Sequence, residues 1–218
     1  MANIFTNHSC KEVLIVPFKT ASSYVKQHLA NNADWQYTSV WDYTLGCSRF
    51  PNTAIWLWLQ RQNLSKYRIT LVGRDPLEWL ISSYKYINYV ENGGDQNRVF
   101  EFNEHLETMI KGDYPSNNWQ YHACVFPQDY YTPNQTHYIE IDNLVNLKWF
   151  RHSQEKINSS ENYPDPKISK EELEIIEHVT RPRYQYLNYG FEDSLKRWQL
   201  RQDSNLQPLA SDASALSN

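Results

Sequence analysis

Two short apolar runs, each followed by a turn and an amphipathic segment, constrain the fold of this chain more than any other feature. Residues 12–17 (EVLIVP) are almost entirely apolar and rich in β-branched side chains, and residues 67–73 (YRITLVG) share that character. Such runs are typical of strands that are buried on both faces of a sheet. After the first run, Val25 and Leu29 stand four residues apart, which predicts one face of a helix. Repeated strand, loop and helix predict a sheet with helices on both faces.

Other parts of the chain continue this alternation. Residues 37–41 and 136–141 (THYIEI) predict two further short strands. Helix starts are marked by Asp75 as a cap with Pro76 behind it, and by the capping box at 169–172 (SKEE). We therefore expect an α/β domain with a central, mainly parallel sheet of four or five strands flanked by helices.

The chain has 218 residues, which is enough for one such domain. We assign residues 1–192 to the domain. Residues 202–218 are rich in Ser, Ala, Asn and Asp and show little periodicity. We expect residues 193–218 to form a disordered tail.

Charge and composition exclude several classes of partner. A net charge of −4 argues against binding of nucleic acid or anionic membrane by bulk electrostatics. No apolar run approaches the ~20 residues of a membrane span, and residues 1–11 lack the features of a signal peptide. Three widely spaced cysteines indicate free thiols in a reducing compartment rather than a zinc site. We expect a cytoplasmic protein with no nucleic-acid partner and no membrane span, and the sequence predicts no particular oligomeric state.

The turn after the first predicted strand carries the first candidate site, residues 17–23 (PFKTASS). The N-terminus of a helix presents unpaired N–H groups and a positive dipole, which bind anions. Lys19 adds a full positive charge. The residues that follow are small and mostly hydroxylated, so a phosphate could approach the backbone closely: they are Thr20, Ala21, Ser22 and Ser23. An ordinary capped helix start with an exposed lysine explains the same residues, and this segment alone does not distinguish the two.

The second candidate site is residues 74–84 (RDPLEWLISSY). Arg74 leaves the end of a predicted strand, which is where ligands of open α/β sheets bind. Ser82 follows eight residues later on the predicted helix. A guanidinium and a hydroxyl that converge there are suited to a second phosphate. The alternative is a strand–turn–helix junction whose arginine pairs with a neighbouring carboxylate.

The two segments resemble the PAPS-binding signatures of sulfotransferases, especially the carbohydrate and Golgi-type branch (PAPS is 3′-phosphoadenosine 5′-phosphosulfate). Residues 18–24 (FKTASSY) resemble the 5′-phosphosulfate loop, often PKTGSTS, and residues 74–84 resemble the 3′-phosphate motif RDPxxRxxSxY. Weaker likenesses to family segments lie at 122–128, which ends in PQ, and at 138–144 (YIEIDNL). The resemblance covers roughly residues 11–192. It implies a P-loop-like sulfotransferase fold.

The resemblance also implies roles for the residues that match. Lys19 would contact the oxygen that bridges sulfur and phosphorus, and the backbone of residues 20–23 would hold the 5′-phosphate. Arg74 and Ser82 would hold the 3′-phosphate, and no metal is implied. Two positions depart from the family: Ala21 stands where a glycine is usual, which matters if that residue needs a positive φ, and Trp79 replaces an arginine.

Transfer of the sulfuryl group also needs a base to accept the proton of the acceptor. The family uses a glutamate or a histidine, and no motif identifies it here. Asp42, after the second predicted strand, is the first candidate, and His122 is the second. The acceptor is expected to be a small molecule or a glycan with a hydroxyl or amine, and the nucleotide product is adenosine 3′,5′-bisphosphate.

Two other functions are compatible with the same features. A nucleotide or small-molecule kinase also uses a strand, a loop with Lys-Thr and a helix, but its GxxxxGK[ST] loop needs glycines, and residues 13–20 contain none. A non-catalytic relative that binds the nucleotide or a glycan is the third possibility. Binding of adenosine 3′,5′-bisphosphate without magnesium would distinguish a sulfotransferase from a kinase. Turnover would distinguish a sulfotransferase from a non-catalytic relative.

Overall fold

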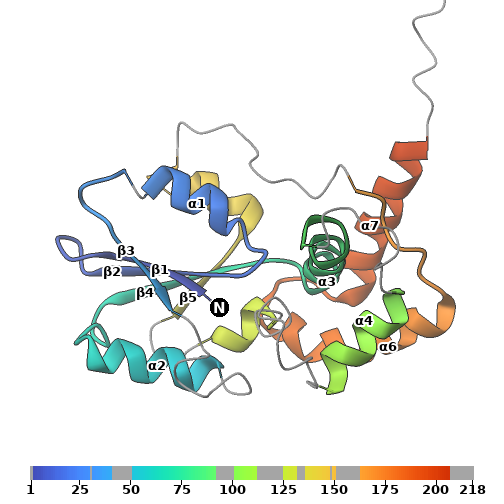
Figure 1. The fold of residues 1–218 in the computed structure, drawn as a ribbon, viewed down its shortest axis with the longest axis horizontal. Helices are drawn as coiled ribbons and strands as arrows, with labels where there is room; N and C mark the ends of the chain where they lie inside the picture. The colour runs from blue at the N-terminus through green and yellow to red at the C-terminus, as the bar shows by residue number, and fades with distance from the viewer. Residues whose placement is uncertain are drawn as a thin grey trace, which may run out of the picture.

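The computed structural model describes residues 2–29, 31–40, 51–91, 101–111, 125–131, 136–147, 149–150 and 163–206. At its centre is a five-stranded sheet with the strand order β3-β1-β2-β4-β5 (Figure 1). The strands are β1 (Ala2–Asn7), β2 (Glu12–Pro17), β3 (Gln36–Val40), β4 (Arg68–Gly73) and β5 (Thr136–Glu140). The α-helices are α1 (Ser22–Leu29), α2 (Pro51–Arg61), α3 (Pro76–Lys85), α4 (Phe102–Lys111), α6 (Lys170–Thr180) and α7 (Phe191–Leu206). Short helical turns are η2 (Tyr86–Glu91), η4 (Pro127–Tyr130), η5 (Ile141–Asn146) and η7 (Arg181–Tyr186).

The sheet is only partly parallel. β2 pairs in parallel with β4, and β4 pairs in parallel with β5. β1 pairs antiparallel with both β2 and β3. The predicted number of strands is confirmed, but the prediction of a mainly parallel sheet is wrong, because β1 lies between β2 and β3.

A hairpin without glycine explains why β1 was not predicted. The chain reverses between β1 and β2 over residues 8–11, where Lys11 has a φ of 56° and the Asn7 side chain accepts a hydrogen bond from the Cys10 N–H at 3.0 Å. Asn-Gly or Asp-Gly pairs are the usual sequence signal of a tight hairpin. The sequence here is His-Ser-Cys-Lys, so the signal is missing.

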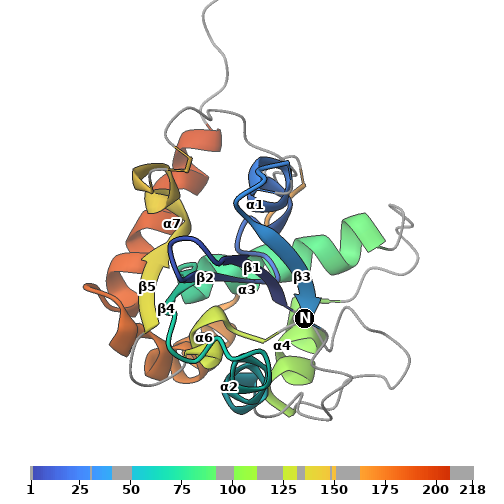
Figure 2. The same ribbon diagram turned by 90° about the vertical axis from the view of Figure 1, so that its left-hand side faces the viewer.

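Each face of the sheet is covered by a different helix (Figures 1 and 2). Successive side chains of a strand point to opposite faces. Val13 and Ile15 of β2 therefore pack in the cluster that contains Ile55 and Leu59 of α2, on one face. On the other face, β2 packs through Leu14 and Val16 in the cluster that contains α1. Burial on both faces explains the continuously apolar sequence of β2.

A separate group of helices lies beyond the carboxyl ends of β2 and β4, at the right of Figure 1. α3, α4, α6 and α7 enclose one hydrophobic cluster, which includes Leu80 of α3, Leu106 of α4, Ile176 of α6 and Phe191 of α7. Phe18, from the loop after β2, is buried in the same cluster. The loop that carries Lys19 therefore lies at the junction between the sheet and this helical group.

Helix α7 corrects the predicted start of the tail. Residues 193–206 were expected to be disordered, but they belong to α7, while residues 207–218 lie outside the described residues. Ser194 is buried, and Leu195 and Trp198 pack against the helical cluster. These three positions share one helix face. The sequence signal of this face is weak, because two of these three residues are large and apolar and the third is a serine.

In the described part of the chain, no helix combines the length and the apolar character needed to cross a lipid bilayer.

Candidate functional site

The loop between β2 and α1 is a tight turn with two residues in the left-handed region. Lys19 has a φ of 63° and Ala21 a φ of 60°. Thr20 lies between them, and both its N–H and its hydroxyl donate to the Pro17 carbonyl, at 3.3 and 2.7 Å. Thr20 is fully buried. Its hydroxyl therefore stabilises the turn.

Backbone N–H groups at the start of α1 remain available for an anion. Among the described residues, the structure records no acceptor for the N–H groups of Ala21, Ser22 and Ser23. Successive N–H groups in a turn with left-handed residues can form an anion-binding concavity, and the helix dipole adds positive potential there. The hydroxyl-bearing Ser22 is partly exposed and Ser23 is exposed. The backbone therefore has a conformation that suits an anion, and binding of one at this turn stays a prediction.

Ala21 does require a positive φ, so the departure from glycine has a cost. A non-glycine residue in the left-handed region costs roughly 1–2 kcal/mol. The Ala21 methyl group packs against the cluster of apolar residues around α1, which offsets part of that cost. The turn thus keeps the conformation that a glycine would allow.

Two contacts hold the Lys19 loop against α3 and the helical turn η2 that follows it. Trp79 is fully buried, and its indole Nε1–H donates to the Phe18 carbonyl at 2.9 Å. The Phe18 ring meets the Tyr86 ring edge-on, with centroids 5.0 Å apart. Trp79, at the position of the family's arginine, therefore supplies an anchor for the loop and no positive charge.

The Lys19 ammonium group lies over an aromatic ring. Its Nζ is 4.5 Å from the centroid of Tyr86 and 5.8 Å from that of Phe18. An ammonium group in this position is attracted by the electron-rich faces of the rings. The charge is thereby directed toward the side of α3 that faces the loop.

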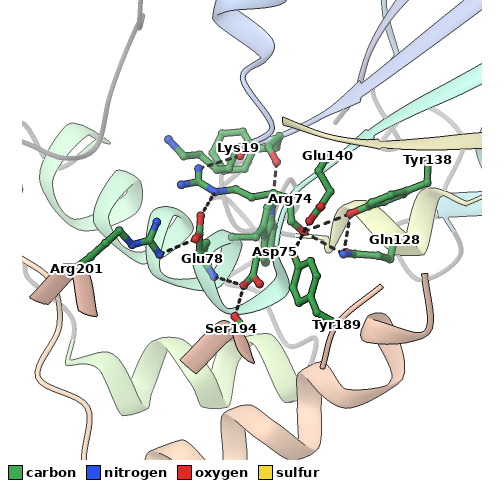
Figure 3. Close-up of polar contacts among 12 residues, drawn as sticks. Lys19, Arg74, Asp75, Glu78, Gln128, Tyr138, Glu140, Tyr189, Ser194 and Arg201 are labelled. Atoms are coloured by element: carbon green, nitrogen blue, oxygen red, sulfur yellow. Dashed lines mark hydrogen bonds and ion pairs between the residues drawn. The ribbon is translucent and has the colours of Figure 1, made fainter. Parts of the chain in front are cut away.

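Arg74 joins the second candidate segment to the first. It follows β4 directly, and its Nη1 donates to the Lys19 carbonyl at 3.4 Å (Figure 3). Its Nε lies 3.8 Å from a carboxylate oxygen of Glu78, one helical turn further on. Burial lowers the pKa of the Arg74 guanidinium, and the Glu78 carboxylate partly counteracts that shift. Arg74 thus has a carboxylate partner, as the alternative interpretation of this segment expected, and it also contacts the Lys19 loop.

Ser82 lies on the same side of α3 as these contacts. Glu78 and Ser82 of α3 are four residues apart, which places them along one face of the helix. Tyr86 follows Ser82 by another four residues, and the Lys19 ammonium lies over its ring. Ser82 lies between the two points of contact and is buried. The structure therefore brings Lys19 and Arg74 together, and the role of Ser82 beside them stays a prediction.

The start of α3 is held by a buried carboxylate. Asp75 is the N-cap of α3 and accepts hydrogen bonds from the Glu78 N–H at 3.1 Å and from the Ser194 hydroxyl at 2.6 Å. Burial raises the pKa of Asp75, and the hydrogen bond from Ser194 opposes that shift. Pro76 occupies the first turn of the helix, as predicted. The sequence identified the cap but gave no sign of Ser194, which lies 119 residues away.

The Arg74 carbonyl is held from the other side by two residues. The Gln128 side chain donates to it at 3.0 Å, and the Tyr138 hydroxyl lies 3.4 Å from it (Figure 3). Gln128 also donates to the Tyr138 hydroxyl at 3.0 Å. Both residues come from the two segments with weaker family likeness, so all four segments converge at the end of β4.

Several polar residues near the site were not predicted from the sequence. Glu78 could have been identified, because it stands four residues after Arg74 on the predicted helix. Arg201 donates to Glu78 at 2.6 Å, and Tyr189 donates to Glu140. Arg201 and Tyr189 had no sequence signal, because their contacts span long stretches of the chain.

The two predicted bases, Asp42 and His122, lie outside the described residues. Their assignments stay predictions. Within the described ranges, no three His, Cys, Asp or Glu side chains gather in a way that could hold a metal ion.

Replacing Trp79 with phenylalanine should lower the free energy of unfolding by about 2–3 kcal/mol. The Phe18 carbonyl would lose its donor, and the smaller ring would leave a void beside Phe126, whose ring centroid is 4.6 Å from that of Trp79. The measurement is a urea titration followed by circular dichroism.

Trp198→Phe is the matched control for this variant. Trp198 packs against the same helical cluster, and its Nε1–H has no hydrogen-bond acceptor among the described residues. This substitution loses packing alone, so we expect a loss of about 1 kcal/mol. Equal losses for the two variants would contradict a role for the Trp79 hydrogen bond.

A comparison of the chain with protein-family models, curated proteins and solved structures found no match.

Proposed function

We propose that this chain is a PAPS-dependent sulfotransferase that acts on a hydroxyl or amine of a small molecule or glycan. The observation that carries the proposal is the hydrogen bond from Arg74 Nη1 to the Lys19 carbonyl. It joins two segments, 55 residues apart, that were each identified from the sequence as a phosphate-binding motif. A nucleotide with phosphates on the 3′ and 5′ positions of one ribose can be bound by both segments only if they lie side by side.

The residues present fit such a nucleotide. The N–H groups of residues 21–23 suit the 5′-phosphate, because they lack acceptors among the described residues. The Nε of Arg74 is buried and has no hydrogen-bond partner within the described residues. A buried guanidinium N–H without an acceptor is costly, and a phosphate oxygen would satisfy it. Ser82 would add a hydroxyl to the same end.

Lys19 is the residue that we assign to catalysis. PAPS supplies a sulfuryl group whose bond to a 5′-phosphate oxygen breaks, with the electron pair staying on that oxygen, as the acceptor forms its bond to sulfur. The Lys19 ammonium would stabilise the negative charge that develops on the departing oxygen. Asp42 and His122 are the candidates for the base that takes the proton of the acceptor.

The finer description of the fold belongs to the same proposal. β2, the Lys19 loop and α1 form a strand–loop–helix unit, and β4 with α3 forms a second unit beside it, in parallel with the first. This arrangement is the one expected of a P-loop-like sulfotransferase. Cytoplasmic location stays a prediction.

Calorimetry with adenosine 3′,5′-bisphosphate, without magnesium, tests the proposal. Wild type should bind, and Arg74→Ala should bind about 10- to 100-fold more weakly, because a charge-assisted contact to the 3′-phosphate is lost. Arg68→Ala is the control. Arg68 is the first residue of β4, at the end of the strand away from Arg74, and it is exposed and pairs with Glu12 of β2. Absence of wild-type binding, or equal binding by wild type and Arg74→Ala, would overturn the proposal.

A further inference from the structure

A carboxylate lies between two guanidinium groups beside the Lys19 loop. Glu78 of α3 accepts a hydrogen bond from Arg201 Nη2 at 2.6 Å, and its second oxygen lies 3.8 Å from Arg74 Nε (Figure 3). Arg201 belongs to α7 and is 123 residues from Glu78 in sequence. One internal anion therefore connects two cations that belong to different parts of the chain.

The Glu78 carboxylate contacts Arg201 more closely than it contacts Arg74. The contact with Arg201 has the length of a strong, charge-assisted hydrogen bond. The contact with Arg74 is an ion pair too long to be a hydrogen bond. Arg74 Nε is buried without a hydrogen-bond acceptor among the described residues. A larger anion with more oxygens would satisfy Arg74 better than the Glu78 carboxylate does.

The exposure of the two guanidinium groups also differs. Arg74 is fixed by its bond to the Lys19 carbonyl, and its side chain is 23% exposed. The Arg201 side chain belongs to α7 and is 52% exposed. The more exposed Arg201 side chain therefore has more room than Arg74 to turn toward a neighbouring anion.

We propose that Arg201 is the second cation of the 3′-phosphate site and that the 3′-phosphate displaces the Glu78 carboxylate from between Arg74 and Arg201. A phosphate monoester has three terminal oxygens and close to two negative charges, so it can accept from both guanidinium groups. The carboxylate then turns away, because two anions at the same place repel each other. This inference rests on the proposed function, and it supplies the cation that Trp79 does not.

The arrangement determines which nucleotides bind tightly. Adenosine 5′-monophosphate has no 3′-phosphate, so it leaves Glu78 paired with Arg201. Adenosine 3′,5′-bisphosphate gains contacts with the guanidinium groups of Arg74 and Arg201, and the pair between Glu78 and Arg201 is lost. The site thus selects for the 3′-phosphate, and Glu78 lowers the affinity for the bisphosphate by competing with it.

Calorimetry on the full chain with both nucleotides tests the inference. Arg201→Ala should weaken binding of the bisphosphate about tenfold and change binding of the monophosphate less than about twofold. Lys196→Ala, which removes a charge from an exposed position of the same helix, should change neither. Glu78→Gln should bind the bisphosphate about threefold to tenfold more tightly, because the competing charge is gone.

Each other outcome overturns a defined part of the proposal. If wild type binds the bisphosphate and Arg201→Ala binds it equally well, the role of Arg201 is wrong and the proposed function stands. If Arg201→Ala loses both nucleotides equally while its circular dichroism spectrum is unchanged, selection for the 3′-phosphate is wrong. Weaker binding by Glu78→Gln would overturn the competition. If wild type does not bind the bisphosphate, the proposed function itself fails.

Discussion

Replacing Lys19 with methionine should lower the turnover number for sulfuryl transfer by about 100- to 1000-fold and change the affinity for adenosine 3′,5′-bisphosphate less than about tenfold. The ammonium group is assigned to an oxygen whose negative charge grows only as the bond to sulfur breaks, so its contact is strongest in the transition state. Methionine keeps most of the aliphatic stem that packs near Phe18 and Tyr86 and removes the charge alone. The measurement is transfer of labelled sulfate from PAPS to a panel of glycan and small-molecule acceptors.

Lys26 provides a closely matched control. Its ammonium lies 4.8 Å from the Tyr37 ring centroid, just as that of Lys19 lies 4.5 Å from Tyr86. Lys26→Met therefore loses the same kind of cation–π contact on α1, outside the loop. We expect its turnover to equal that of wild type. A Lys19→Met variant that retains more than about a tenth of wild-type turnover would contradict the catalytic assignment.

The parts of the fold that follow local rules could be predicted from the sequence. β2 and β4 were recognised from continuously apolar runs, and the structure places both inside the sheet, in parallel. The Asp75 cap of α3 and the capping box of α6 are present with the predicted hydrogen bonds. In each case the signal and the structure it specifies lie within a few residues of each other.

The parts that depend on distant partners could not be predicted. β1 is stabilised by pairing with two other strands, and its short, mixed sequence gives no periodicity of its own. α7 is polar on most of its surface, and it is held by Ser194 against Asp75 and by apolar side chains that pack in the helical cluster. A pattern within one segment cannot reveal contacts of this kind.

In the candidate site too, residues with a local sequence signal could be predicted and residues held by distant contacts could not. Short motifs predict Lys19, Arg74 and Ser82, and the structure shows a direct contact between Lys19 and Arg74. The Glu78–Arg201 pair that modifies the charge around Arg74 was missed. The sequence can therefore indicate which residues approach a phosphate, but the local balance of charge is decided by which distant helix packs beside them.

Replacing Gly73 with alanine should lower the free energy of unfolding by about 3 kcal/mol and the melting temperature by about 6–12 °C. Gly73 is the last residue of β4, and a methyl group added there would lie 1.9 Å from both Cζ and Oη of Tyr138. Tyr138 belongs to the neighbouring strand β5, and its hydroxyl accepts a hydrogen bond from Gln128. The ring cannot move away without breaking the contacts that hold the Arg74 carbonyl, so the substitution should also weaken nucleotide binding.

Two further variants test whether the ring of Tyr138 is the cause. Nothing lies within 4 Å of a methyl group added at Gly190, so Gly190→Ala should cost less than about 1 kcal/mol, mainly through its position before α7. Tyr138→Ala removes the ring, so adding Gly73→Ala to it should cost almost nothing more, and the two substitutions should be far from additive in thermal denaturation. If Gly73→Ala is as stable as Gly190→Ala, or if its cost persists without the ring, the close packing of β4 against Tyr138 does not position Arg74, and the convergence of the four segments at this edge of the sheet loses its physical basis.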